Sequence, residues 1–150
     1  MSYTNLEISQ MDLNDFLEIK NDLTTQFDDF WNESTLENEL NLANSLYLVA
    51  KINNEIVGFA GIKTVLDEAD IMNIVTKKSR RNLGIATELL EKLIYIAKEK
   101  NIKQLTLEVS EQNSPAIHLY EKLGFKKIAV RKKYYQNTYD AFIMQMNLKN

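Results

Sequence analysis

The sequence predicts a single α/β domain over residues 1–150, built on a mixed, mostly antiparallel sheet with helices on both faces. Segments with the apolar alternation of strands are interspersed with segments of helical periodicity, which is the pattern of an α/β domain. The length suits one domain, and there is no repeat, low-complexity stretch or linker rich in Pro, Gly or Ser. We therefore expect one core and the element order β-α-α-β-β-β-α-β-α-β-β.

The first 44 residues are expected to form one strand and two helices. Residues 3–9 alternate as a strand, and Asp12 offers a cap for a helix with apolar residues at helical spacing. Ser34 and Glu37 have the capping-box spacing, so a second short helix should begin there and run to about residue 44. An aromatic-rich acidic segment, residues 27–31, joins the two helices.

The central residues are expected to form three strands and a long helix. Strands are predicted at 46–52, 55–65 and 69–76, and Asn53-Asn54 is a turn signal between the first two. After a short basic loop, apolar residues at helical spacing between Leu83 and Ala97 predict an amphipathic helix.

The remaining residues are expected to add a strand, a helix and two closing strands. Apolar residues alternate over 105–109, as in a strand. Asn113 or Ser114 would cap the next helix, which has a proline in its first turn and a glycine at its end. The closing strands are predicted at 125–135 and 140–148.

Composition excludes several classes of protein. The hydrophobic content of 45% and charged content of 26% are typical of soluble globular proteins, and no apolar run approaches the roughly 20 residues of a membrane helix. Because the first residues also lack the features of a signal peptide, we expect a cytoplasmic protein with no membrane partner. With no cysteine and one histidine, His118, the chain offers little for a metal site or a Ser-His-Asp triad, so no metal is expected.

The net charge of −3 is unevenly distributed. Residues 12–39 contain nine acidic residues and one basic residue, whereas basic residues gather within 77–81 and 126–133. Two local basic patches suit a small polyanion better than a nucleic acid, so no nucleic-acid partner is expected. The alternative is that these residues are solvated loops.

Gly84 indicates a phosphate-binding site at the start of the long helix. A helix N-terminus presents unpaired N–H groups and partial positive charge, and glycine lets an anion approach the backbone closely. Arg80 and Arg81 would add charge for a pyrophosphate or a ribose phosphate. The alternative is a glycine that merely eases a tight turn from strand to helix.

Several linked motifs resemble the GNAT acetyltransferase family. Residues 81–86, Arg-Asn-Leu-Gly-Ile-Ala, are similar to the family signature R/Q-x-x-G-x-G/A, and residues 113–125 are similar to its segment N-x-x-A-x-x-L-Y-x-x-x-G-F. Residues 66–69, 107–109, 131–135 and 140–144 look most like the RimI branch, which acetylates the N-terminal alanine of a ribosomal protein. Three positions depart from the branch pattern: Ala86 replaces a glycine, Ser110 an arginine and Gln136 a proline.

The resemblance implies acetyl-CoA as cosubstrate and a set of residues that bind it. Backbone amides of Ile74, Val75 and Thr76 would meet the pantetheine chain and the developing oxyanion. Asn113 would contact CoA, although it could equally be a simple helix cap. The amides that would hold the pyrophosphate belong to Arg81, Asn82, Leu83, Gly84, Ile85, Ala86 and Thr87.

Two residues are candidates for proton transfer. Glu108 alternates with the apolar residues of its strand and could take the proton from the attacking amine, which is also the role of the matching residue in the RimI branch. The alternative for Glu108 is a solvated position at the rim of the sheet. Tyr120 matches the family tyrosine that donates a proton to the CoA sulfur. The alternative for Tyr120 is a packing role.

The resemblance implies an acceptor protein N-terminus, possibly that of a ribosomal protein. Trp31, Tyr134 and Tyr135 could line the acceptor cleft, and the acidic N-terminal third could attract a basic protein. Two alternatives stay open: a small-amine acetyltransferase acting on a polyamine, aminoglycoside or amino acid, and a non-catalytic acyl-CoA-binding sensor. The sequence predicts no oligomeric state.

Overall fold

The computed structural model describes residues 5–27, 33–81, 84–135 and 139–148, with only the backbone described for residues 33–35 and 133–135. The predicted element order is confirmed. The strands are β1 (Leu6–Gln10), β2 (Ser45–Ile52), β3 (Glu55–Val65), β4 (Glu68–Thr76), β5 (Gln104–Ser110), β6 (Lys126–Tyr135) and β7 (Tyr139–Asn147). The helices are α1 (Leu13–Ile19), α2 (Glu33–Leu40), α3 (Ile85–Glu99) and α4 (Ser114–Leu123), with short 3-10 turns η1 (Lys20–Asp22) and η2 (Lys78–Arg80).

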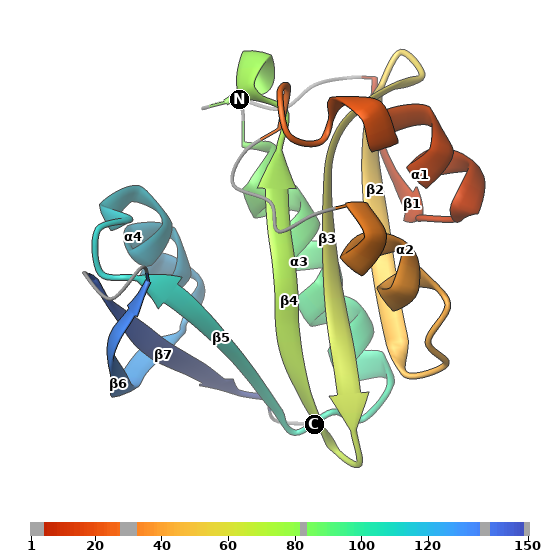
Figure 1. Cartoon of the computed structure of the whole chain (residues 1–150). Coiled ribbons are helices and arrows are strands. Elements are labelled where there is room, and N and C mark those ends of the chain that lie inside the picture. The colour runs from red at the N-terminus through yellow and green to blue at the C-terminus, as the bar shows by residue number, and fades with distance from the viewer. Residues whose placement is uncertain (1–4, 28–32, 82–83, 136–138, 149–150) are drawn as a thin grey trace.

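The seven strands form one sheet in the order β1-β2-β3-β4-β5-β7-β6. Every neighbouring pair is antiparallel except β4 and β5, which are parallel. These two strands pair only where Glu68–Asp70 of β4 lie beside residues 104–106 of β5. Beyond those pairs the strands diverge, and the sheet opens into the V visible in Figure 1.

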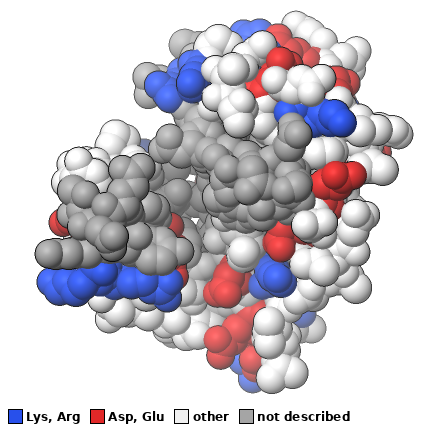
Figure 2. All heavy atoms as spheres, in the orientation of Figure 1, with Lys and Arg blue, Asp and Glu red and all other residues white. Residues whose placement is uncertain are grey.

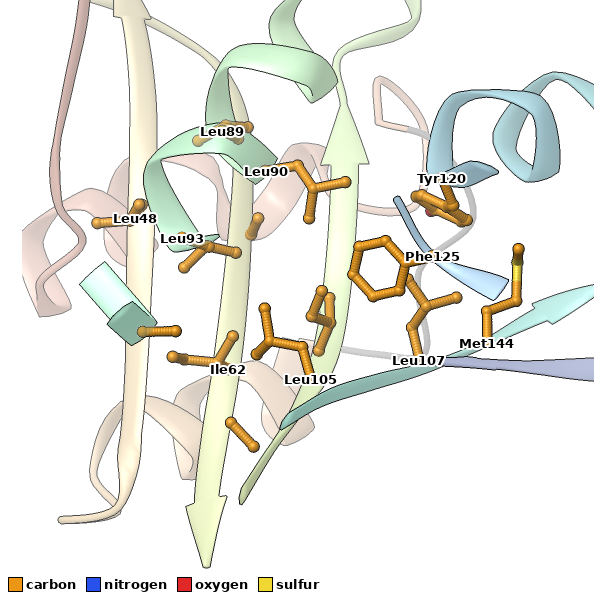
Figure 3. Packing of buried hydrophobic residues seen from close by; sticks show 14 of the residues in the cluster. Leu48, Ile62, Leu89, Leu90, Leu93, Leu105, Leu107, Tyr120, Phe125 and Met144 are labelled. Atoms are coloured by element: carbon orange, nitrogen blue, oxygen red, sulfur yellow. The ribbon is translucent and has the colours of Figure 1, made fainter. Parts of the chain in front are cut away.

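Helices cover both faces of the sheet, as predicted. On one face α3 buries Leu89, Leu90 and Leu93 in a cluster that also takes residues from β2, β3, β5 and β7 (Figure 3). On the other face α1 and α2 pack over a second cluster that includes Phe16 and Leu36. The alternating burial of β5 follows from this arrangement because successive side chains point to opposite faces.

A register shift in β4 determines which of its residues face the opening of the V. Asn73 pairs with Gly61, but Ile71 pairs with the next residue of β3, which leaves Met72 as an extra residue. Ile71 therefore belongs to the α3 cluster, whereas Val75, four residues later, belongs to the α1–α2 cluster. A buried hydrogen bond stabilises the shifted register, since the Asn73 amide donates to the Tyr47 hydroxyl at 3.0 Å.

Tyr47 lies directly against Gly61, where a Cβ atom would come within 2.4 Å of the ring. Only glycine leaves room for this ring. Burial raises the pKa of the Tyr47 hydroxyl to about 12, so the group stays neutral and able to bond Asn73.

Two of the three helix caps expected from the sequence are present, and the third is not. Asp12 caps α1 in a reciprocal capping box with Asp15, and Asn113 caps α4 by accepting from the Ala116 amide. Ser34 was expected to cap the second helix, but α2 begins at Glu33 and ends at Leu40, so that expectation is wrong. Ser34 lies inside the first turn, where the capping-box spacing has no meaning.

Candidate active site

A cleft of about 770 Å³ lies where β4 and β5 diverge. One wall comes from the end of β4 and the start of α3, and the other from the end of β5 and α4. The volume falls within the range of about 300–1,000 Å³ that is common for small-molecule sites. The lining residues are Ile74, Thr76, Arg81, Gly84, Ile85, Ala86, Thr87, Ser110, Gln112, Asn113, Pro115, Ala116, Leu119 and Tyr120.

The start of α3 gives one end of this cleft the properties of an anion site. Gly84 precedes the helix with a φ of 79°, in the left-handed region that side chains disfavour. It makes no side-chain cap, so the first amides of a 15-residue helix are available to a ligand. Arg81 also lines the cleft, which adds positive charge at the same end.

The loop before this helix is tied to the rest of the fold by one carboxylate. Glu55, at the start of β3, bonds Lys77 Nζ at 2.8 Å and Arg80 Nη2 at 2.9 Å. Hydrogen bonds from these two cations lower the pKa of Glu55. Arg80 was expected to add charge for a phosphate, but it is held by Glu55 and does not line the cleft.

Peptide groups of β4 line the same wall of the opening as the start of α3. Past Asp70, the described part of β4 pairs with β3 on one side only, so alternate peptide groups of residues 71–76 face the cleft side. The side chains of Ile74 and Thr76 line the cleft, whereas Val75 is buried on the other face. A ligand could therefore meet Val75 through its backbone alone.

Tyr120 stands on the α4 wall of the cleft. The residue is 9% exposed, and its ring packs edge-on against Phe125, with ring centroids 6.1 Å apart. Figure 3 shows the Phe125 ring beside Leu107 of β5, with Tyr120 next to Phe125. The packing role weighed for Tyr120 is therefore present, and its position in the cleft is compatible with chemistry as well.

Glu108 projects from the opposite face of β5. Leu107 and Val109 are buried on the side of α3 and α4, whereas the Glu108 side chain is 31% exposed. Its Oε1 lies 3.1 Å from Nη2 of Arg131 on β6, and Arg131 Nη1 donates to its Oε2 at 3.5 Å. The two candidates for proton transfer thus flank β5 on opposite faces at the mouth of the V.

The structure brings most of the predicted cosubstrate residues together and adds others. Asn113 lines the cleft and also caps α4, so the cap is present and its contact with CoA stays a prediction. Trp31, Asn82 and Leu83 lie outside the described residues, and Tyr134 and Tyr135 are described only as backbone of β6. Sequence reasoning missed five lining residues, which are Ser110, Gln112, Pro115, Ala116 and Leu119. Three of them, Pro115, Ala116 and Leu119, lie within the motif segment 113–125, so their position in that segment was the available signal.

Within the described residues no helix could cross a membrane, and no group of three acidic or histidine side chains is placed to hold a metal ion. The basic residues of 126–132 lie exposed along β6, the last strand of the sheet, and form the row of Lys and Arg at the left of Figure 2. The acidic N-terminal region is partly neutralised, since Asp15 pairs with Lys51 and Glu39 with Lys63.

Comparison with known proteins identifies the family. A model of the acetyltransferase (GNAT) family matches residues 16–125. The chain belongs to the GNAT family. It is thus an N-acetyltransferase by family, and the predicted fold class, enzyme class and resemblance are confirmed.

Among GNAT proteins the chain is similar to enzymes that act on a ribosomal protein. It is 45% identical over 107 residues, 70% of either chain, to the [ribosomal protein bS18]-alanine N-acetyltransferase of Haemophilus influenzae. The crystal structure of the ribosomal-protein-S18-alanine N-acetyltransferase from Escherichia coli matches 97% of this chain and 95% of its own, with a TM-score of 0.89 and 30% identity. A GNAT acetyltransferase from Elizabethkingia anophelis with acetyl-CoA bound shares the fold, covering 97% of this chain and 100% of its own at a TM-score of 0.75 and 22% identity.

Proposed function

We propose that this GNAT protein transfers the acetyl group of acetyl-CoA to the N-terminal α-amine of a ribosomal protein that begins with alanine. The named relatives in Haemophilus influenzae and Escherichia coli support this acceptor. The observation that carries the proposal is the placement of Tyr120 and Glu108 on opposite faces of β5 at the mouth of the cleft. A donor held in the cleft and an acceptor arriving from the other face could then react directly. A ribosomal acceptor would also place the reaction in the cytoplasm.

The cleft residues suit the parts of acetyl-CoA. The amides at the start of α3, with Arg81, would hold the pyrophosphate, and we keep Asn82 and Leu83 in this group from the sequence motif. Backbone groups of Ile74, Val75 and Thr76 would meet the pantetheine chain and the oxygen on which charge develops. When bound, acetyl-CoA supplies the thioester carbonyl that the amine attacks and the thiolate that leaves.

Glu108 would accept the proton of the attacking amine. An α-amine has a pKa of about 8, so it is largely protonated at neutral pH and cannot attack in that form. A nearby carboxylate, acting directly or through one water molecule, is enough to remove the proton. Glu108 is exposed on the acceptor face, where an incoming N-terminus can reach it.

Tyr120 would donate a hydrogen bond to the sulfur of the departing CoA thiolate. A phenol has a pKa of about 10 and a thiol one of about 8.5. Full protonation of the thiolate by the phenol is therefore uphill by roughly 2 kcal/mol. Tyr120 therefore donates a hydrogen bond to the sulfur as negative charge develops, and proton transfer is completed as the amine loses its own proton. Trp31, Tyr134 and Tyr135 remain our candidates for holding the acceptor peptide.

A peptide series tests this acceptor. Purified protein would be given acetyl-CoA and otherwise identical basic peptides beginning with Ala, Ser or Met, together with a peptide whose N-terminus is already blocked. We expect acetylation measured by mass spectrometry to be fastest for Ala, absent for the blocked peptide, and at least about 10-fold slower for polyamines, aminoglycosides and free amino acids.

Other outcomes would contradict the proposal in distinguishable ways. Faster turnover of a small amine than of any peptide would favour the small-amine acetyltransferase. Binding of acetyl-CoA without acetylation of any acceptor would favour the non-catalytic sensor. An absence of measurable acetyl-CoA binding would contradict the assignment of the cleft itself.

A further inference from the structure

Arg131 makes a two-point contact with the candidate proton acceptor. Its Nη2 lies 3.1 Å from Oε1 of Glu108, and its Nη1 lies 3.5 Å from Oε2. The two terminal nitrogen atoms of the guanidinium thus each contact one oxygen atom of the same carboxylate. This fork geometry restricts the orientation of a carboxylate more than a single ammonium contact does.

The register of the sheet brings these two residues together across β7. Glu108 lies opposite Ile143, and Arg131 lies opposite Ala141. Ala141 and Ile143 are two apart on β7, so Glu108 and Arg131 project from the same face and meet as diagonal neighbours. Ala141, which pairs with Arg131, is fully buried and carries only a methyl group as its side chain.

This pair contributes little to the stability of the fold. The Arg131 and Glu108 side chains are 49% and 31% exposed, and an ion pair as exposed as this one adds little to the free energy of unfolding. The carboxylate nevertheless needs a defined position if it is to take a proton from an amine, because misplacing a reacting group by about 1 Å can lower a rate roughly 100-fold. The consequence of the pair is therefore expected in the rate of acetyl transfer.

We propose that Arg131 is a positioning residue that holds the Glu108 carboxylate in the orientation needed to accept the amine proton. The proposal rests on the proposed function of Glu108 as the proton acceptor. Arg131 acts through Glu108 and not on the acetyl donor, since it does not line the cleft. Lysine at this position would keep the charge but lose the fork.

A double-mutant cycle tests the coupling. Arg131→Met, Arg131→Lys, Glu108→Gln and the double variant Arg131→Met/Glu108→Gln would be compared by kcat/KM on the acceptor that the unmodified protein acetylates best. We expect Arg131→Met to lower kcat/KM about 10- to 100-fold and Arg131→Lys to give a smaller loss. The double variant should be no slower than Glu108→Gln alone, because arginine has no further effect once its carboxylate is gone.

The neighbouring Lys132→Met variant is the matched control. Lys132 lies on the same strand and pairs with Asp140 at 3.6 Å, so its loss removes a comparable surface charge away from Glu108. It should keep kcat/KM within about 2-fold, and all variants should keep the acetyl-CoA dissociation constant and the thermal unfolding midpoint of the unmodified protein.

Two results would overturn the positioning role. One is an Arg131→Met variant as active as the unmodified protein. The other is a double variant in which the two losses multiply, which would show that Arg131 acts independently, for example by binding the acceptor. A failure of the proposed acceptor would appear differently, as turnover of amines other than N-terminal peptides, on which the same cycle can be measured.

Discussion

At the scale of single residues, the hydroxyl of Tyr120 is the group most open to a clean test. Tyr120→Phe keeps the ring that packs against Phe125 and removes only the oxygen that would bond the departing sulfur. We expect kcat to fall about 10- to 100-fold while the KM for acetyl-CoA changes little, because the bond forms as charge develops. Steady-state kinetics with a saturating acceptor would measure both. Tyr95→Phe, the same change on the exposed face of α3, should be neutral; an unchanged kcat in Tyr120→Phe would remove tyrosine from the mechanism.

Sequence reasoning at this scale identified residue types and faces better than it identified partners. The alternation of β5 correctly separated Glu108 from the apolar residues on either side of it. It could not reveal the contact with Arg131, because that contact depends on the order β5-β7-β6 and on the register of both strand pairs. The pairing of Arg80 with Glu55 was missed for the same reason, since 25 residues separate them.

At the scale of elements, the loop between β4 and α3 is held in place before any ligand arrives. Glu55 bonds Lys77 and Arg80, and the Lys78 amide donates to the Gln26 carbonyl at 2.7 Å. Glu55→Gln would weaken both side-chain contacts and release two cations near the anion site. If the contacts position the loop, the acetyl-CoA dissociation constant should rise about 3- to 10-fold, the equivalent of one or two exposed ion pairs.

A fall in the acetyl-CoA dissociation constant of Glu55→Gln would assign a different role to Glu55. If this carboxylate merely offsets positive charge, its removal would tighten the binding of a polyanion, and calorimetric titration with acetyl-CoA would show a lower dissociation constant. Either that result or an unchanged constant contradicts the positioning of the loop. Glu91→Gln, on the exposed side of α3, controls for the loss of one negative charge.

The sequence predicted the long helices and strands, but it did not predict local irregularities within them or at their ends. The apolar spacing of α3 predicted most of the residues that it buries but missed Ile85. Asn113 and Gly124 marked the two ends of α4. The extra residue at Met72 was not predicted from the sequence of β4, because a register shift is decided by the pairing partner. The start of α2 was misplaced because the capping-box pattern is short and occurs inside helices as well.

At the scale of the whole molecule, the cleft exists because two halves of the sheet stay joined at one end only. Three paired positions connect β4 and β5, and the diverging ends form the walls of the site. A single hydrophobic cluster nevertheless spans both halves, from Leu48 and Ile62 to Leu105 and Met144 (Figure 3). We infer that this shared core, more than the short ladder, keeps the V at a fixed opening.

Leu105→Ala tests that inference at the point where the halves meet. Leu105 is fully buried, pairs with Ala69 of β4, and belongs to the cluster that both halves share. Truncating it should lower the free energy of unfolding by about 2–5 kcal/mol in urea titrations, while Leu17→Ala, half-exposed on α1, should cost less than about 1 kcal/mol. Unfolding should remain a single transition by circular dichroism and by hydrogen exchange, because both halves depend on one core. Separate transitions for residues 45–76 and 104–147 would instead mean that the halves fold independently, and the V would then owe its opening to the three-residue ladder alone.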